Sequence, residues 1–218
     1  MITASDVASA VGDNHYESPD AFVRKKVLKT KWAGNVATAH GTLLEPFVRD
    51  LYDARFGKKT TEIGLVQHRD YPFIGGSADG ITDDGILLEI KCPLTRKIEN
   101  KVPVYYMPQI QLLLEILDFE DCDFVQYKPA GAPDANGVPQ PPEQFVVTRV
   151  KRDREWFKAK LPIMQAIWDK VIKGRESGLC EIQNDPIPWD PLFKRDVVCE
   201  VQKEDGAEVP TQVEDSQV

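Results

Sequence analysis

Apolar residues recur at helical spacing in the first part of the chain. Thr3 or Ser5 can cap a first short helix, which Gly12 ends. Serine followed by proline at positions 18 and 19 begins a second helix that runs through Leu28. A third predicted helix ends at Gly57 and buries a stripe formed by Leu44, Phe47, Val48, Leu51 and Tyr52.

The pattern changes to that of β-strands after residue 57. Segments 61–68, 73–81 and 86–92 are short and rich in β-branched and aromatic residues. Asp70-Tyr71-Pro72 and Asp83-Asp84-Gly85, which separate them, are typical turn sequences. These segments therefore predict an antiparallel meander.

The second half of the chain returns to helices and then adds two strands. Helical spacing covers residues 103–118, and strands are predicted at 122–128 and 144–150, joined by a Pro- and Gly-rich link at 129–142. An amphipathic helix follows over about 153–173. This order predicts an α/β (mixed α+β) fold with a central mixed sheet flanked by helices.

Length and composition favour one compact cytoplasmic domain. The chain has 218 residues, of which 42% are hydrophobic, and we expect one domain over residues 1–203. Residues 204–218 are acidic and poor in apolar residues, which predicts a disordered tail. The sequence has no run of about 18 apolar residues and no secretory signal pattern, so we expect no membrane association. The cysteines are far apart, which predicts reduced structural thiols at Cys92, Cys122, Cys180 and Cys199.

The net charge of −8 argues against a protein that coats nucleic acid nonspecifically. It leaves room for a local basic groove, because basic residues cluster at 24–31 and at 151–154. Taken alone, each cluster is equally well explained as the solvated face of a helix.

The strongest candidate for chemistry is the predicted hairpin that contains Asp79, Glu89 and Lys91. Alternate residues of a strand share a face, so Glu89 and Lys91 lie on the same side as Leu87. Charges in a strand of this apolar kind are costly to bury unless they pair or bind a metal. Hairpin pairing would bring the Asp79 carboxylate toward Glu89, and the preceding Gly75-Gly76 allows close backbone approach.

Two carboxylates and a strand carbonyl form an oxygen-rich site that suits magnesium or manganese. Such an ion can activate water and neutralise the charge that develops on a phosphate, and a neighbouring lysine adds a donor. An ordinary Glu/Lys ladder on an exposed sheet face, with a turn aspartate, explains these residues equally well when they are taken alone.

Ordered sequence blocks give these residues a family context. The order Asp79, then Glu89-Ile90-Lys91, resembles the PD-(D/E)xK nuclease core. The surrounding sequence resembles the phage lambda exonuclease, viral alkaline exonuclease and YqaJ-type recombinase family, which has a restriction-endonuclease-like core. The matching blocks are Ile2-Thr3-Ala4-Ser5, Gly41-Thr42-Leu43-Leu44-Glu45, Ser77-Ala78-Asp79-Gly80, Leu88-Glu89-Ile90-Lys91-Cys92-Pro93 and Tyr106-Met107-Pro108-Gln109-Ile110-Gln111.

The resemblance implies a role for each residue of the hydrolytic site. It implies that Asp79 and Glu89 ligate the metal, with help from the Ile90 carbonyl, and that Lys91 assists the attacking water. Glu45 matches the helix glutamate that completes the metal site, with a plain helix ion pair as the alternative. A further match is the glutamine near the catalytic lysine, which corresponds to Gln109.

The resemblance also implies a phosphate site. Ser5 and Ser77 match serines that hold the terminal 5′-phosphate of DNA. The family's arginine-x-glycine before the first block is missing, because the sequence begins at Met1 and Ile2. Either the N-terminus is truncated or another cation substitutes, and the candidates for that cation are Arg24, Lys25 and Arg96.

The function implied by the resemblance is a magnesium-dependent 5′→3′ exonuclease of phage or prophage origin. It would use two Mg²⁺ ions, with Mn²⁺ as a substitute, to release 5′-mononucleotides from ends of double-stranded DNA. The remaining 3′ strand would pass to a single-strand annealing protein for recombination, and the enzyme would be a homotrimer ring. Two alternatives remain open, namely a structure- or site-specific endonuclease of the same fold and a non-catalytic protein that binds DNA ends.

Overall fold

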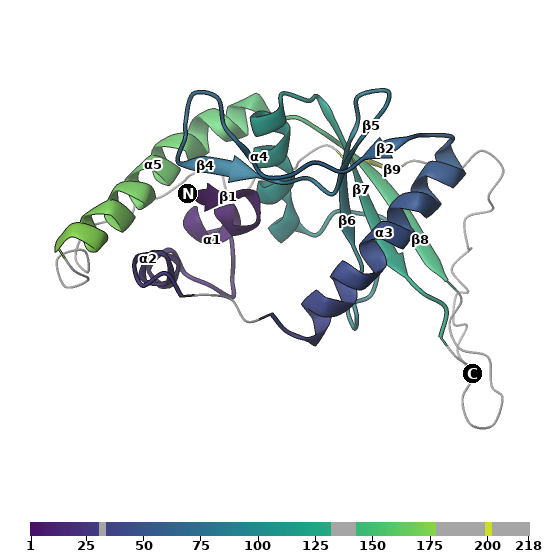
Figure 1. Ribbon diagram of the computed structural model, residues 1–218, viewed down its shortest axis with the longest axis horizontal. Coiled ribbons are helices and arrows are strands. Elements are labelled where there is room, and N and C mark those ends of the chain that lie inside the picture. The colour runs from purple at the N-terminus through teal and green to yellow at the C-terminus, as the bar shows by residue number, and fades with distance from the viewer. Residues whose placement is uncertain (31–33, 132–142, 178–198, 202–218) are drawn as a thin grey trace, which may run out of the picture.

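A mixed β-sheet flanked by helices forms the body of the protein in the computed structural model, which describes residues 1–30, 34–131, 143–177 and 199–201 (Figure 1). Strands β6 and β7 are parallel, and the other neighbouring strands are antiparallel. The strands in spatial order are β2 (Thr60–Thr61), β5 (Gly80–Thr82), β6 (Leu87–Lys91), β7 (Asp121–Lys128), β8 (Gln144–Lys151) and β9 (Cys199–Val201). The predicted central mixed sheet is confirmed.

A second, smaller sheet contains strand β4 between strands β1 and β3. Their bounds are β1 (Ile2–Thr3), β3 (Val66–Gln67) and β4 (Ile74–Gly76). The predicted continuous meander is therefore wrong, because segments 61–68 and 73–81 each divide between the two sheets. Close packing accounts for part of this division: a Cβ on Gly76 would lie 2.7 Å from Leu113 Cδ2 and 3.1 Å from Ala4 Cβ. The backbone of β4 thus lies directly against helix α4.

The helices mostly begin and end at the residue types that favour helix ends. Ser18 caps α2 by accepting from the Ala21 amide, and Gly57 ends α3 with a φ of 62°. Asn35 caps α3, which therefore begins earlier than predicted. The helical elements are η1 (Ala4–Asp6), α1 (Val7–Ala10), α2 (Pro19–Val27), α3 (Val36–Phe56), η2 (Val104–Tyr106), α4 (Met107–Leu117) and α5 (Arg154–Ser177).

The N-terminal segment differs from the predicted capped helix. Ile2 and Thr3 form a strand, and the Thr3 hydroxyl donates to Asp6 at 2.6 Å without capping the helix backbone. Ile2 is fully buried, and pairing of β1 with β4 satisfies backbone groups that a buried N-terminal segment would otherwise leave without partners.

The core lies on both faces of the main sheet. On one face, Leu87 and Phe124 pack with residues of α4 and α5, and on the other, Leu88 and Ile90 pack with Val48 of α3. Strand β6 therefore alternates as predicted, and its Leu87 face is the one that carries Glu89 and Lys91.

Several expectations concern residues that the structure treats only in part. The expected tail at 204–218 and most of the link at 129–142 lie outside the described residues. Among those that are described, Cys92 and Cys122 are free and buried. In the same part of the chain, no helix is both long and apolar enough to cross a bilayer.

Candidate active site

The β5–β6 hairpin places the Asp79 side chain beside strand β6. The Asp79 amide donates to the Leu88 carbonyl at 3.1 Å, which continues the hairpin by one residue before β5. The Asp79 carboxylate accepts from the Ile90 amide at 2.6 Å. Pairing therefore directs Asp79 toward Glu89 and Ile90, as the sequence predicted.

Glu89 lies at the centre of the site and is 1% exposed. Its Oε1 accepts from Gln109 Nε2 at 2.6 Å and also from the ammonium of Lys91. Its Oε2 is buried and has no hydrogen-bond partner among the described residues. A buried carboxylate oxygen without a partner is costly, so this atom marks the place where a cation would be most stabilising.

Arginine 49 is a site residue that the sequence analysis missed. It is 9% exposed, and its Nη1 donates to the Asp79 carbonyl and to Glu62 Oε2, each at 3.0 Å. Its Nη2 lies 3.7 Å from Glu45 Oε1, one helical turn earlier on α3. The spacing from Glu45 to Arg49 and the neighbouring buried Val48 were the available signals. Arg49 links the helix that carries Glu45 to the strand end that carries Asp79.

The carboxylates in this site disfavour one another's charge. Burial raises the pKa of Glu89 to about 7, and the negative charges of Asp79 and Glu45 add to that rise. Desolvation likewise raises the pKa of Asp79 and of Glu45. Desolvation opposes the charge on Lys91, yet the carboxylates of Glu89 and Asp79 hold its pKa above the ordinary value. The site thus combines a permanent ammonium with carboxyl groups whose ionisation a cation would favour.

The donors fit a hard divalent cation. Asp79, Glu89 and Glu45 offer carboxylate oxygens, and Ile90 offers a strand carbonyl, which is the donor chemistry that magnesium prefers. Among the described residues, no group of His, Cys, Asp or Glu side chains is drawn together closely enough to form a ready-made metal cage. The carboxylates have other partners instead: that of Asp79 accepts from the Ile90 amide, and that of Glu89 pairs with Lys91.

The two serines predicted to bind phosphate lie at the same end of the smaller sheet. Parallel pairing sets Thr3 beside Gly75, and Ser5 and Ser77 each lie two residues further along their chains. Both serines are exposed, and the Ser77 hydroxyl donates to the Ile63 carbonyl at 3.0 Å. The β1 strand that the sequence analysis missed is what brings these two segments together.

The three candidate cations differ in their surroundings. Arg24 is exposed on α2. Lys25 pairs with Glu17 at 2.8 Å and lies 3.7 Å from Asp6, so it is near Ser5 but already shared between carboxylates. Arg96 lies over the Tyr106 ring at 5.9 Å, and Lys91 Nζ lies 5.4 Å from the same ring. Arg96 and Lys91 thus lie at the same aromatic ring, whereas Arg24 and Lys25 lie on α2.

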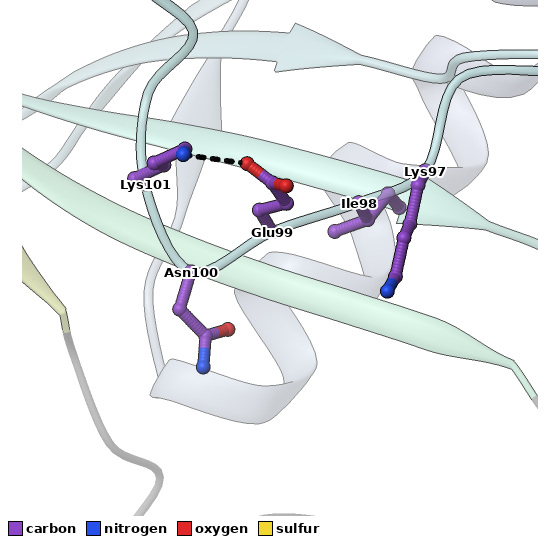
Figure 2. A pocket seen from close by; sticks show the side chains of 5 residues that line it. All are labelled: Lys97, Ile98, Glu99, Asn100 and Lys101. Carbon is purple, nitrogen blue, oxygen red and sulfur yellow. Dashed lines mark ion pairs between the residues drawn. The ribbon is translucent and has the colours of Figure 1, made fainter. Parts of the chain in front are cut away.

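A surface pocket in the loop after β6 contains none of the predicted site residues. Figure 2 shows its lining by Lys97, Ile98, Glu99, Asn100 and Lys101, with Lys101 paired to Glu99 at 2.9 Å. Its residues all come from one stretch of loop, and the candidate residues Asp79, Glu89 and Lys91 lie elsewhere.

A family profile and curated relatives match the region that carries the site. Residues 1–120 match the YqaJ-like viral recombinase domain. The chain is 30% identical over 146 residues to the uncharacterized protein R354 of Acanthamoeba polyphaga mimivirus, which covers 58% of this chain and 27% of that protein. It is 32% identical over 143 residues to protein D345L of African swine fever virus (strain Badajoz 1971 Vero-adapted), which covers 51% of this chain and 41% of that protein. The chain spans less than half the length of these relatives.

Solved structures extend the likeness across most of the chain. The alkaline exonuclease LHK-Exo from Laribacter hongkongensis matches with a TM-score of 0.66 and 29% identity, over 80% of this chain and 89% of that one. LHK-Exo in complex with dAMP matches with a TM-score of 0.61 and 28% identity, over 84% and 91% of the two chains. A phage-related exonuclease from Haemophilus somnus 129PT shares the fold at 16% identity and a TM-score of 0.53, over 83% and 92%. These matches confirm the predicted family and restriction-endonuclease-like fold, and they support the prediction of a nuclease.

Proposed function

This chain belongs to the family of YqaJ-like viral recombinase domains, and from that premise we propose that it is a metal-dependent exonuclease acting on DNA. The observation that carries the proposal is the buried Glu89 carboxylate. One of its oxygens is held by Lys91 and Gln109, and the other has no partner among the described residues. An ordinary exposed Glu/Lys ladder would have neither this burial nor this unsatisfied oxygen.

The residues of the site divide the work of hydrolysis among them. Asp79, Glu89, Glu45 and the Ile90 carbonyl would hold Mg²⁺, which supplies Lewis-acid stabilisation and a water of lowered pKa. The Lys91 ammonium would donate to the attacking water or to the phosphate oxygen on which charge develops. Gln109 fixes the orientation of the Glu89 carboxylate through its hydrogen bond to Oε1.

Arg49 would position the metal ligands, and the two serines would position the DNA. Arg49 holds the Asp79 carbonyl and lies near Glu45, so it sets the separation of two ligands on different elements. Ser5 and Ser77 would donate to the terminal 5′-phosphate, with Arg24, Lys25 and Arg96 as sources of positive charge. Ser77 lies two residues before Asp79, so a phosphate held there is close to the metal ligands.

The proposal also covers the polarity, the metal ions, the products and the assembly of the enzyme. The enzyme would digest one strand of double-stranded DNA in the 5′→3′ direction, use two Mg²⁺ ions or Mn²⁺, and release 5′-mononucleotides. The solved LHK-Exo complex with dAMP supports mononucleotide release. The 3′ strand would pass to a single-strand annealing protein, in the cytoplasm of a bacterial host. A homotrimer ring would let a chain of net charge −8 enclose DNA with a local basic lining.

A linear duplex labelled at either end tests the proposal. With Mg²⁺, we expect nucleotides to be released first from a 5′-phosphorylated end, and more slowly from a 5′-hydroxyl end. Early release of a 3′-terminal label would contradict the polarity. Cutting of a closed circular plasmid, which has no ends, would instead support an endonuclease. A wild-type protein that binds ends without degrading them would be the non-catalytic alternative.

Magnesium is expected to stabilise the fold more at alkaline than at acidic pH. Because the pKa values of Glu89, Asp79 and Glu45 are raised in the folded protein, the unfolded chain releases these protons first. The metal-free fold therefore loses stability as the pH rises from their ordinary values through about 7, the pKa of Glu89. Carboxyl groups with a lowered pKa, such as Asp6, contribute to stability with the opposite sign. Their contribution is lost only at lower pH, as they become protonated.

Thermal unfolding with and without MgCl₂ measures this effect. We expect the rise in Tm caused by Mg²⁺ to be larger near pH 8 than near pH 5.5 by at least about 3 °C, or about 1 kcal/mol for a protein of this size. In Asp79→Asn, the pH dependence of the Mg²⁺ effect should shrink. An equal shift at both pH values in the wild type would show that the cation does not bind these carboxyls.

A further inference from the structure

A line of aromatic rings runs from the candidate active site to the surface. Tyr106 lies against Phe124 of the core at 5.4 Å between ring centroids, and Lys91 Nζ lies 5.4 Å from the Tyr106 ring. The Tyr105 ring is 4.5 Å from Tyr106, and its other neighbour, His15, is 6.1 Å away. His15 in turn lies 3.7 Å from Tyr16. We call Tyr106, Tyr105, His15 and Tyr16 the aromatic row.

The outer end of the aromatic row is open to solvent. Tyr16 is 84% exposed, the highest value among the exposed large hydrophobic residues that the structure describes. His15 is exposed too, and Tyr105 and Tyr106 are half-buried. The row joins elements far apart in sequence, because Tyr16 and His15 lie between α1 and α2 while the other two rings end η2.

The protein holds the exposed end of the row in place. Asp13 lies two residues before His15 and pairs at 2.8 Å with Lys160, which is only 2% exposed. The Asn14 side chain donates to Ser9 and accepts from the Tyr16 amide, each at 2.9 Å. The backbone that carries His15 and Tyr16 is therefore held in place.

The loop between β6 and η2, which precedes Tyr105 and Tyr106, is also held by hydrogen bonds. Gln126 is fully buried, and its amide donates to the carbonyls of Glu99 and Lys101 at 2.9 and 3.2 Å. These contacts hold the loop between β6 and η2, which contains Arg96 and leads into Tyr105 of η2. Arg96 lies 5.9 Å from the Tyr106 ring, so positive charge accompanies the row.

We propose that the aromatic row is a binding site for unpaired DNA, in which bases stack on Tyr16, His15 and Tyr105 beside the strand that enters the active site. Aromatic faces accept any base, and cations beside them accept the phosphates, which is the chemistry of single-strand binding. Continuity with Lys91 and the charge of Arg96 favour nucleic acid over an apolar protein partner. This inference rests on the proposed nuclease function for the identity of the strand.

A fluorescent base in metal-free DNA tests the row directly. The probe is a duplex with a short unpaired 5′ segment that contains 2-aminopurine, whose fluorescence falls when the base stacks. We expect the wild-type protein to quench this signal, and Tyr16→Ala to weaken binding roughly tenfold and reduce the quenching. Tyr16→Phe keeps the ring and should behave like the wild type, whereas Tyr16→Leu, which is apolar without a ring, should behave like Tyr16→Ala.

An abasic substitution separates stacking from a structural effect of the mutation. If Tyr16 stacks on a base, removal of that base should eliminate most of the difference between the wild type and Tyr16→Ala. Equal weakening by Tyr16→Ala on abasic and intact DNA would overturn the proposal, as would wild-type quenching by Tyr16→Leu.

The same duplex with Mg²⁺ reports on the nuclease independently. Quenching without any hydrolysis by the wild type would leave the stacking site standing and refute the proposed function. Hydrolysis without quenching, together with equal DNA affinity of Tyr16→Ala and the wild type, would support the nuclease function and refute the stacking site.

Discussion

Replacing Asp79 or Glu89 by its amide is expected to lower the rate of DNA degradation at least about a thousandfold. Each substitution keeps the size of the side chain but removes a charge that the cation requires, and metal-based stabilisation is worth several kcal/mol of the barrier. Glu89→Gln also removes the negative charge that pairs with the Lys91 ammonium. The measurement is the initial rate of nucleotide release from a linear 5′-phosphorylated duplex at saturating Mg²⁺.

A matched control for these variants is Glu120→Gln on the surface. Glu120 pairs with Arg154 and is 58% exposed. Because exposed ion pairs contribute little to stability, we expect Glu120→Gln to release nucleotides within about twofold of the wild-type rate. Asp79→Asn should keep the wild-type circular dichroism spectrum and should still bind DNA ends in the absence of metal. Activity near the wild-type level in Asp79→Asn or Glu89→Gln would contradict the assignment of the hydrolytic site to this hairpin.

The largest effect on stability is expected for Asp123→Ala, which should lower the free energy of unfolding by about 3–5 kcal/mol. Asp123 is fully buried, and its carboxylate accepts from the Tyr52 hydroxyl at 2.6 Å. Arg149 donates to the same carboxylate through Nε at 2.5 Å and through Nη2 at 3.0 Å. Removal of Asp123 would leave both partners without this acceptor in a region of low exposure.

Urea unfolding monitored by circular dichroism measures this loss. Glu120→Ala removes an exposed carboxylate that pairs with Arg154 and more loosely with Arg152, and it should cost no more than about 1 kcal/mol, which makes it the matched control. A loss in Asp123→Ala no larger than that of Glu120→Ala would mean that solvent or another side chain replaces the missing carboxylate.

Much of the candidate site follows from short-range regularities of the chain. Strand alternation places Glu89 and Lys91 on one face, and hairpin pairing places Asp79 beside Ile90, so local geometry was sufficient for both. The family resemblance added Gln109, which donates to Glu89 from another element. It also added Glu45, which the structure places where its charge raises the pKa of Glu89.

Other features depend on contacts between distant segments. Arg49 occupies an ordinary helix position in the sequence, and only the approach of α3 to the β5 end gives it the Asp79 carbonyl as a partner. The expected meander divides between two sheets, with Ile2 and Thr3 as the strand beside β4. No local pattern predicts this pairing, because a two-residue strand has no period.

The shared face of Glu89 and Lys91 was predictable from the chain alone because the strand repeat sets it, and hairpin pairing added Asp79 as a neighbour. The burial that turns them from a charged ladder into a metal-type site was decided by tertiary structure, since it needs α3 and α4 on the sheet. The same holds for the aromatic row, whose rings come from positions 15–16 and 105–106. Side chains so far apart in sequence meet only through packing of the folded core, which no local spacing encodes.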